Sequence, residues 1–136
     1  MSIDTIGDCL TIIRNGIMRA KPWVLVPYSE LKRSILDVMK NEGFIRDVAV
    51  ESGEGPKKYL KVYLKYVNGE SVIHEVKRVS SPGWRRYGQV RSNGSHTVSP
   101  VIGGLGISIL STNRGILTNK KAKELGVGGE IICTVW

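Results

Sequence analysis

The sequence has little of the side chains on which most enzymes depend. Its 136 residues include only two histidines and two cysteines. Neither His74 nor His96 lies near Cys9 or Cys133 in the sequence, and the two cysteines lack the close spacing of a metal motif. A single histidine in a strand or loop is more often structural than catalytic. We therefore predict no enzyme, no cofactor, no metal site and no small-molecule substrate.

Long apolar segments are also missing. No apolar run reaches the length of about 18 residues that a membrane-spanning helix needs, and no charged-then-apolar leader opens the chain. Both cysteines lie in apolar patterns, which predicts buried, reduced thiols rather than a disulfide framework. The short lysine-rich segment 120–125 has too little apolar surface to lie on a membrane. We expect a soluble, intracellular protein with no membrane partner.

Acidic residues are scarce relative to basic ones. Twelve Asp and Glu stand against 20 Lys and Arg, so the net charge is +8. Residues 1–70 carry 11 basic and 9 acidic groups, net +2, whereas residues 71–136 carry 9 and 3, net +6. Such an excess is typical of a polyanion-binding domain, although a basic surface without a partner is the ordinary alternative. The pattern places the basic face mainly in the second half.

The periodicity predicts an α+β protein of two small, packed parts. In residues 1–68 we expect an α-β-α-β-β domain, with a first helix capped by Asp4 or Thr5 and a second capped by Ser29. The strands are expected at 23–26, 44–50 and 59–66, and a further strand at 71–79 after an Asn68-Gly69 turn. The predicted core includes four residues of the second helix and three of the next strand: Leu31, Ile35, Val38, Met39, Phe44, Val48 and Val50.

Residues 69–136 predict a second domain, mostly antiparallel β with one short helix. An apolar strand over 107–110 leads into Ser111-Thr112-Asn113-Arg114-Gly115, which we call the polar turn. A short helix then begins at Thr118 or Asn119 and ends at Gly126, and a final strand covers 130–135. Residues 88–100 predict a surface loop. The polar turn is either a simple hairpin connection or a cluster of hydroxyls, amide and guanidinium suited to sugars, phosphates and base edges.

Two aromatic segments allow a structural and a functional interpretation. The strand at 59–66 alternates an apolar face with a basic-aromatic one, which favours a solvated sheet face over base stacking. In Trp84-Arg85-Arg86-Tyr87 the arginines suit phosphates and Tyr87 can stack or hydrogen-bond. For Trp84 we expect packing in the core.

Several motifs are collinear with a known family. They are Gly104-Leu105-Gly106, Ser111-Thr112, Arg114-Gly115, the glycine-rich segment from Gly126 to Cys133, Ser81-Pro82-Gly83-x-Arg85-x-Tyr87 and Ile13-Arg14-Asn15. These motifs resemble those of the bacterial-type small-subunit ribosomal protein eight family, with organellar relatives included, over essentially the whole chain. The resemblance implies a cytoplasmic (or organellar) protein of the small ribosomal subunit that binds the central domain of its RNA and helps to assemble the platform. It also implies the fifth and twelfth small-subunit proteins as neighbours.

The expected RNA-binding residues come from the charge pattern and from this resemblance. The family pattern transfers RNA contacts onto Tyr87, Ser111, Thr112 and position 113, and the surrounding charges add Arg85, Arg86 and Arg114. Glu130 either balances Lys120 or Arg114, or accepts hydrogen bonds from base amino groups or 2′-hydroxyls. In the first half the resemblance points to Arg14, Asn15, Ser29 and Lys32. Asn113 and Glu30 depart from the serine and lysine that the family commonly has there.

Two other functions fit the same residues. A protein-interaction module could use the basic face to bind an acidic protein, and a structured-RNA binder could act outside the ribosome. Neither is excluded by composition or periodicity.

Overall fold

A computed structural model describes residues 4–88 and 106–136 of the chain. The chain forms two compact units, residues 1–74 and 75–136, and each is described below by itself. The sequence predicts this boundary after residue 68. The predicted loop at 88–100 lies almost entirely outside the described residues, as do Gly103 to Leu105.

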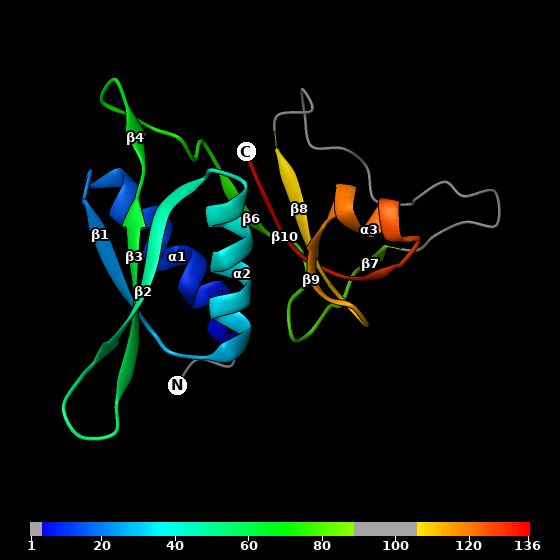
Figure 1. Ribbon diagram of the computed structural model, residues 1–136, viewed down its shortest axis with the longest axis horizontal. Coiled ribbons are helices and arrows are strands. Elements are labelled where there is room, and N and C mark those ends of the chain that lie inside the picture. Colours follow the sequence, from blue (N-terminus) through cyan, green and yellow to red (C-terminus); the bar gives the residue numbers. More distant parts are fainter. Residues whose placement is uncertain (1–3, 89–105) are drawn as a thin grey trace. The chain divides into compact units, whose positions relative to one another are not determined.

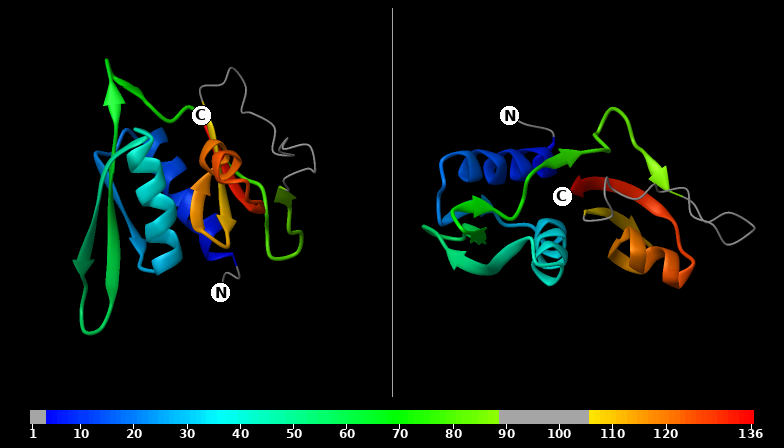
Figure 2. Two further views of the ribbon diagram at one scale, coloured as in Figure 1. Left: turned by 45° about the vertical axis from the view of Figure 1, so that its right-hand side comes forward. Right: turned by 90° about the horizontal axis from the view of Figure 1, so that it is seen from above.

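The first unit places two helices on one face of a small sheet. Helix α1 (Thr5–Met18) is followed by β1 (Trp23–Pro27), α2 (Glu30–Asn41), β2 (Ile45–Ser52) and β3 (Lys58–Leu64). The three strands form an antiparallel sheet in the order β1-β3-β2. Both helices lie on the same side of this sheet (Figure 2). The α-β-α-β-β order is therefore confirmed.

Local signals explain where these elements begin and end. The Asp4 carboxylate accepts a hydrogen bond from the Gly7 backbone N–H at 3.1 Å, which caps α1. Ser29 caps α2 in the same way. A two-residue turn at Asn68-Gly69, with φ of 53° and 80°, joins β4 (Tyr66–Val67) to β5 (Glu70–Ser71), as the sequence predicts.

The core of the first unit differs from the prediction at two positions. Leu31 is 42% exposed, because the buried stripe of α2 is Lys32, Ile35, Leu36 and Met39, which is out of phase with it. Val50 is 43% exposed although its cross-strand partner Leu60 is fully buried. The β2–β3 hairpin projects beyond the helices (Figure 1). Expecting both residues in the core was wrong.

The second unit is an antiparallel sheet centred on its last strand. Its elements are β6 (Val76–Arg78), β7 (Tyr87–Gly88), β8 (Ile107–Thr112), β9 (Gly115–Thr118), α3 (Asn119–Leu125) and β10 (Gly129–Val135). The order is β6-β10-β8-β9, and β7 pairs with β10 beyond the end of β6 (Figure 1). Thr118 caps α3 and Gly126 ends it with a φ of 68°. The β-rich part with one short helix is confirmed.

The predicted strand at 71–79 is wrong as a single element. Glu70–Ser71 pairs with β4 in the first unit, whereas Val76–Arg78 pairs with β10 in the second. The chain passes from one compact unit to the other between these two pairings. A continuous apolar-polar alternation thus serves two separate sheets.

Candidate nucleic-acid interface

Three residues of the predicted site lie in one row across neighbouring strands. Glu130 on β10 is directly opposite Tyr87 on β7 and directly opposite Ser111 on β8. Opposed residues in antiparallel strands project to the same face, and neighbouring strands lie about 4.8 Å apart. Tyr87 is 63% exposed, and Glu130 and Ser111 are half-buried. We call these three residues the cross-strand row.

The polar turn closes the β8–β9 hairpin beside this row. The Thr112 hydroxyl donates to the Gly115 carbonyl at 2.8 Å and accepts from the Arg114 backbone N–H at 3.0 Å. Gly115 has a φ of 100°, which favours glycine. Thr112 therefore has its only hydroxyl proton committed within the turn. Asn113 and Arg114 are exposed at the tip and leave their side chains available to a ligand.

Glu130 pairs with Arg85. The Arg85 Nη1 donates to Glu130 Oε1 at 2.8 Å, with the side chains 46% and 23% exposed. The sequence predicts Lys120 or Arg114 as the balancing cation, and the structure corrects this partner to Arg85. A partly exposed pair of this kind contributes at most about 1 kcal/mol to stability. The ion pair matters for position, because it holds the Arg85 guanidinium of segment 81–86 next to the cross-strand row.

Segment 81–86, which we call the Trp84 turn, is held by a buried serine. Ser80 is fully buried, and its hydroxyl accepts from the Arg86 N–H at 2.8 Å and donates to the Arg86 carbonyl at 3.1 Å. Ser81 and Trp84 exchange backbone hydrogen bonds at 2.9 and 3.0 Å. The Ile131 N–H also donates to the Arg86 carbonyl, which joins the turn to β10. Arg85 and Arg86 are thus displayed from a fixed backbone.

Trp84 itself is not in the core. Its side chain is 70% exposed, and the Arg86 guanidinium carbon lies 5.5 Å from the centre of its ring. The expectation that Trp84 packs in the core is wrong. The backbone hydrogen bonds of the turn direct the Trp84 side chain outward. The spacing of apolar residues in the sequence does not indicate such bonds.

Gly129 brings β10 close to β8 beside the row. A Cβ atom at this position would collide with the backbone carbonyl of Ser111 and would touch the Thr112 side chain. Because backbone atoms cannot rotate away, only glycine fits here without moving a strand. The close approach of β10 to β8 therefore requires glycine at this position.

The predicted residues of the first unit do not form one cluster. Ser29 caps α2, its hydroxyl accepting from the Lys32 N–H at 3.1 Å. Lys32 is only 5% exposed and lines a pocket with Asp8 and Cys9, so it does not stand on the open surface. Arg14 is half-buried on α1, and Asn15 is exposed.

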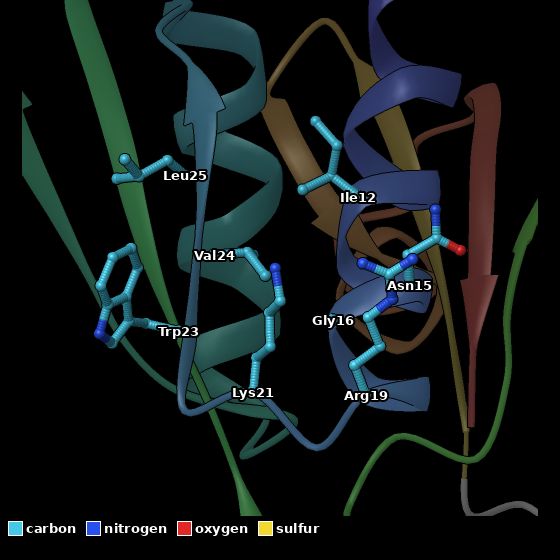
Figure 3. Close-up of a pocket in the computed structure, with 8 residues that line it drawn as sticks. All are labelled: Ile12, Asn15, Gly16, Arg19, Lys21, Trp23, Val24 and Leu25. Atoms are coloured by element: carbon cyan, nitrogen blue, oxygen red, sulfur yellow. The ribbon is translucent and has the colours of Figure 1, made fainter.

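Asn15 lies at a second pocket, of about 350 Å³, between α1 and β1 (Figure 3). Lys21 extends into the space between helix and strand, the Arg19 side chain lies in front of α1 near Asn15 in this view, and Trp23 points away from α1. The Lys21 carbonyl accepts from the Tyr66 hydroxyl at 2.7 Å, which fixes the start of β1. Arg19 and Lys21 also line this pocket, and the sequence motifs do not include them.

Comparison with known sequences decides the family. Residues 4–136 match the family model described as Ribosomal protein S8. The chain is 50% identical over 133 residues to the small ribosomal subunit protein uS8 of Dictyoglomus thermophilum, covering 98% of this chain and 97% of the relative. The uS8 proteins of Dictyoglomus turgidum and Maricaulis maris are each 49% identical, with at least 96% of both chains covered.

The chain belongs to the ribosomal protein S8 family. The resemblance inferred from the motifs is confirmed, and so is the prediction of a small-subunit ribosomal protein rather than an enzyme. As an S8-family member it belongs to the machinery of translation. The match to the D. thermophilum protein covers 98% of this chain and 97% of the relative, so it includes both units of the fold.

Three further properties of the described part of this S8-family chain concern metal binding, membrane-spanning helices and the exposure of cysteines. Within residues 4–88 and 106–136, no group of three or more His, Cys, Asp or Glu side chains could hold a metal ion. None of the described helices is long and apolar enough to cross a membrane. Cys9 and Cys133 are both buried thiols, as predicted.

The basic-aromatic face of β3 is partly occupied by its own side chains. The Lys61 ammonium lies 4.4 Å from the Trp23 ring centre and 5.4 Å from that of Tyr63. It also lies 3.7 Å from a Glu51 carboxylate oxygen. These contacts favour a solvated sheet face on β3 over a surface on which RNA bases stack.

Proposed function

We propose that this S8-family protein binds small-subunit ribosomal RNA directly through its second unit. The observation that carries the proposal is the cross-strand row, in which an aromatic ring, a carboxylate and a hydroxyl lie side by side next to Arg85, Arg86 and the polar turn. The relatives are named as small ribosomal subunit proteins, and a protein of the small subunit has ribosomal RNA as its partner. The net charge of +6 in residues 71–136 supports attraction to phosphates.

The residues divide into two roles. Arg86 and Arg114 are exposed cations that attract phosphates irrespective of sequence. Ser111, Asn113 and Glu130 carry donors and acceptors suited to 2′-hydroxyls and base edges. Tyr87 adds an exposed ring that can stack or donate through its hydroxyl. Charge provides affinity, and the row provides discrimination.

The Arg85–Glu130 pair refines this division. Because the guanidinium holds Glu130 Oε1 at 2.8 Å, the carboxylate is oriented before RNA arrives. Arg85 then contributes less net attraction than Arg86, since Glu130 offsets part of its charge. We assign Arg85 to positioning Glu130 as well as to phosphate contact.

We assign the first unit a secondary RNA contact. Asn15 with Arg14 supplies the contact on α1, Ser29 acts as a helix cap, and Lys32 is left out of the surface because it is buried. The RNA segment is a helix of the central domain, binding helps to assemble the platform, and the neighbours are the fifth and twelfth small-subunit proteins. These three statements rest on the family resemblance.

The test is a titration of the full chain against a central-domain RNA helix and a scrambled duplex at several salt concentrations. We expect tighter binding to the cognate helix and a log–log salt slope of about −3 to −5, from roughly four to six phosphate contacts. A polyglutamate competitor serves as the acidic-protein control and should compete poorly. A slope near zero, or equal competition by polyglutamate and RNA, would contradict RNA binding by this surface.

A further inference from the structure

Trp84 is a large apolar side chain left in water on a rigid support. The indole is 70% exposed, although an aromatic side chain of this size gains free energy by burial. The backbone beneath it is fixed by the Ser81–Trp84 bonds and by the buried Ser80 hydroxyl. Little ordering entropy would therefore be lost at the backbone when a ligand covers the ring. The exposure is built into the turn and is not the result of a loose end.

The neighbourhood of the ring indicates the ligand's chemistry. The other residues of the turn are Ser81, Pro82, Gly83, Arg85 and Arg86, and they provide no aliphatic patch of the kind that a protein hot spot favours. One guanidinium lies 5.5 Å from the ring centre. Aromatic and arginine planes together suit a flat ring that carries a phosphate. A nucleotide has both parts.

The position of the turn restricts which nucleotide fits. A base inside a duplex has both faces covered by its neighbours, so an indole can stack only on a base outside the helical stack. The Trp84 turn leads directly into Tyr87 and is joined to Glu130 through Arg85. A ligand held by the cross-strand row would therefore place adjoining nucleotides near Trp84.

We propose that Trp84 is a binding site for an unpaired base of the RNA, stacked on the indole while Arg86 contacts the phosphate of that nucleotide. This inference rests on the proposed function and adds to it a residue that neither the motifs nor the charge pattern assigned to RNA. The site takes a nucleobase by its face, so it does not depend on base identity.

The experiment is a double-mutant cycle on protein and RNA. Full-length wild type, Trp84→Ala and Trp84→Phe are titrated against the central-domain helix and against versions in which each unpaired nucleotide in turn is made abasic. Stacking energies predict that Trp84→Ala weakens binding to the intact helix about 5- to 100-fold, while Trp84→Phe retains most of the affinity. On one abasic RNA, Trp84→Ala should cause no further loss. The salt slope should stay unchanged, because no charge is removed.

A fluorescence readout tests the contact without relying on affinity. The chain has three tryptophans, so a Trp23→Phe, Trp136→Phe background leaves Trp84 as the only one. Stacking should quench its emission on addition of the intact helix, and the one abasic RNA that breaks the cycle should fail to quench it. Melting curves check that each variant folds. We expect the Trp84 variants to fold, because the Trp84 side chain is exposed.

The outcomes separate this inference from the proposed function. If wild type binds the cognate helix with the expected slope but Trp84→Ala binds equally well, the Trp84 site is refuted and RNA binding stands. Equal loss on intact and all abasic RNAs would also refute stacking. If Trp84→Ala keeps RNA affinity but loses association with another ribosomal protein, the turn is a protein-docking site instead. Failure of wild type to bind any RNA refutes both proposals.

Discussion

Replacing Gly129 by alanine should damage the fold and the cross-strand row together. Gly129 lies opposite Thr112 on β8 and opposite Gly88 on β7. The added methyl group would collide with the Ser111 carbonyl, which is backbone and cannot rotate aside. β10 and β8 must then separate next to the Glu130–Ser111 pair. Overpacking a well-packed site costs about 1–3 kcal/mol, and we expect about 3 kcal/mol here because backbone has to move.

Thermal and chemical unfolding measure this loss. A change of about 3 kcal/mol should lower the melting temperature by roughly 10 °C in a chain of this size. Gly83→Ala is the matched control, since its added Cβ has no described atom within 4 Å apart from its chain neighbours, and its φ is not in the left-handed region. That variant should stay within about 0.5 kcal/mol of wild type. If Gly129→Ala melts like Gly83→Ala and binds RNA like wild type, the close approach of β10 to β8 does not organise the site.

Three further substitutions test individual contacts. Ser80→Ala should destabilise by about 2 kcal/mol in urea unfolding, because the Arg86 N–H loses its partner; a loss below the measurement error would show that Ser80 does not hold the Trp84 turn. Thr112→Val should cost about 1 kcal/mol by removing the donor to Gly115, and should leave the affinity of the folded protein for RNA within about twofold. Burial raises the pKa of the Cys9 thiol from 9.0 to about 11, partly opposed by the Lys32 charge, so the folded state holds its proton more tightly and stability should fall as the pH rises from 9.0 toward about 11. Over this pH range the free energy of unfolding should fall by about 2 kcal/mol more in the wild type than in Cys9→Ala. An identical loss in the two proteins would contradict a buried Cys9 thiol.

Much of the fold could be predicted because its signals are local. The caps at Asp4, Ser29 and Thr118 and the turn at Asn68-Gly69 each depend on residues within four positions of one another. The predicted strand at 71–79 failed for the opposite reason. Its two ends pair with β4 and with β10, and the alternation of side chains carries no information about which sheet a strand joins.

The candidate site divides in the same way. Family resemblance pointed to Tyr87 and Ser111, and the chemistry of a carboxylate pointed to Glu130. Only the register of β7, β10 and β8 places the three in one row. Trp84 was misassigned, because an apolar residue is expected in a core unless the backbone of its turn is known. The family resemblance pointed to Lys32 as an RNA contact, and only the structure shows that this residue falls on the buried stripe of α2.

The central claim is that charge and readout are carried by different residues of one surface. Titrating Arg86→Ala and Ser111→Ala against the cognate helix and a scrambled duplex, across a range of salt concentrations, tests it most directly. Arg86→Ala should weaken binding to both RNAs and reduce the salt slope by about one. Ser111→Ala should leave the slope unchanged and cost about 1–3 kcal/mol on the cognate helix alone. Equal losses on both RNAs for Ser111→Ala, or a lower melting temperature with unchanged affinity, would contradict the readout role of the cross-strand row.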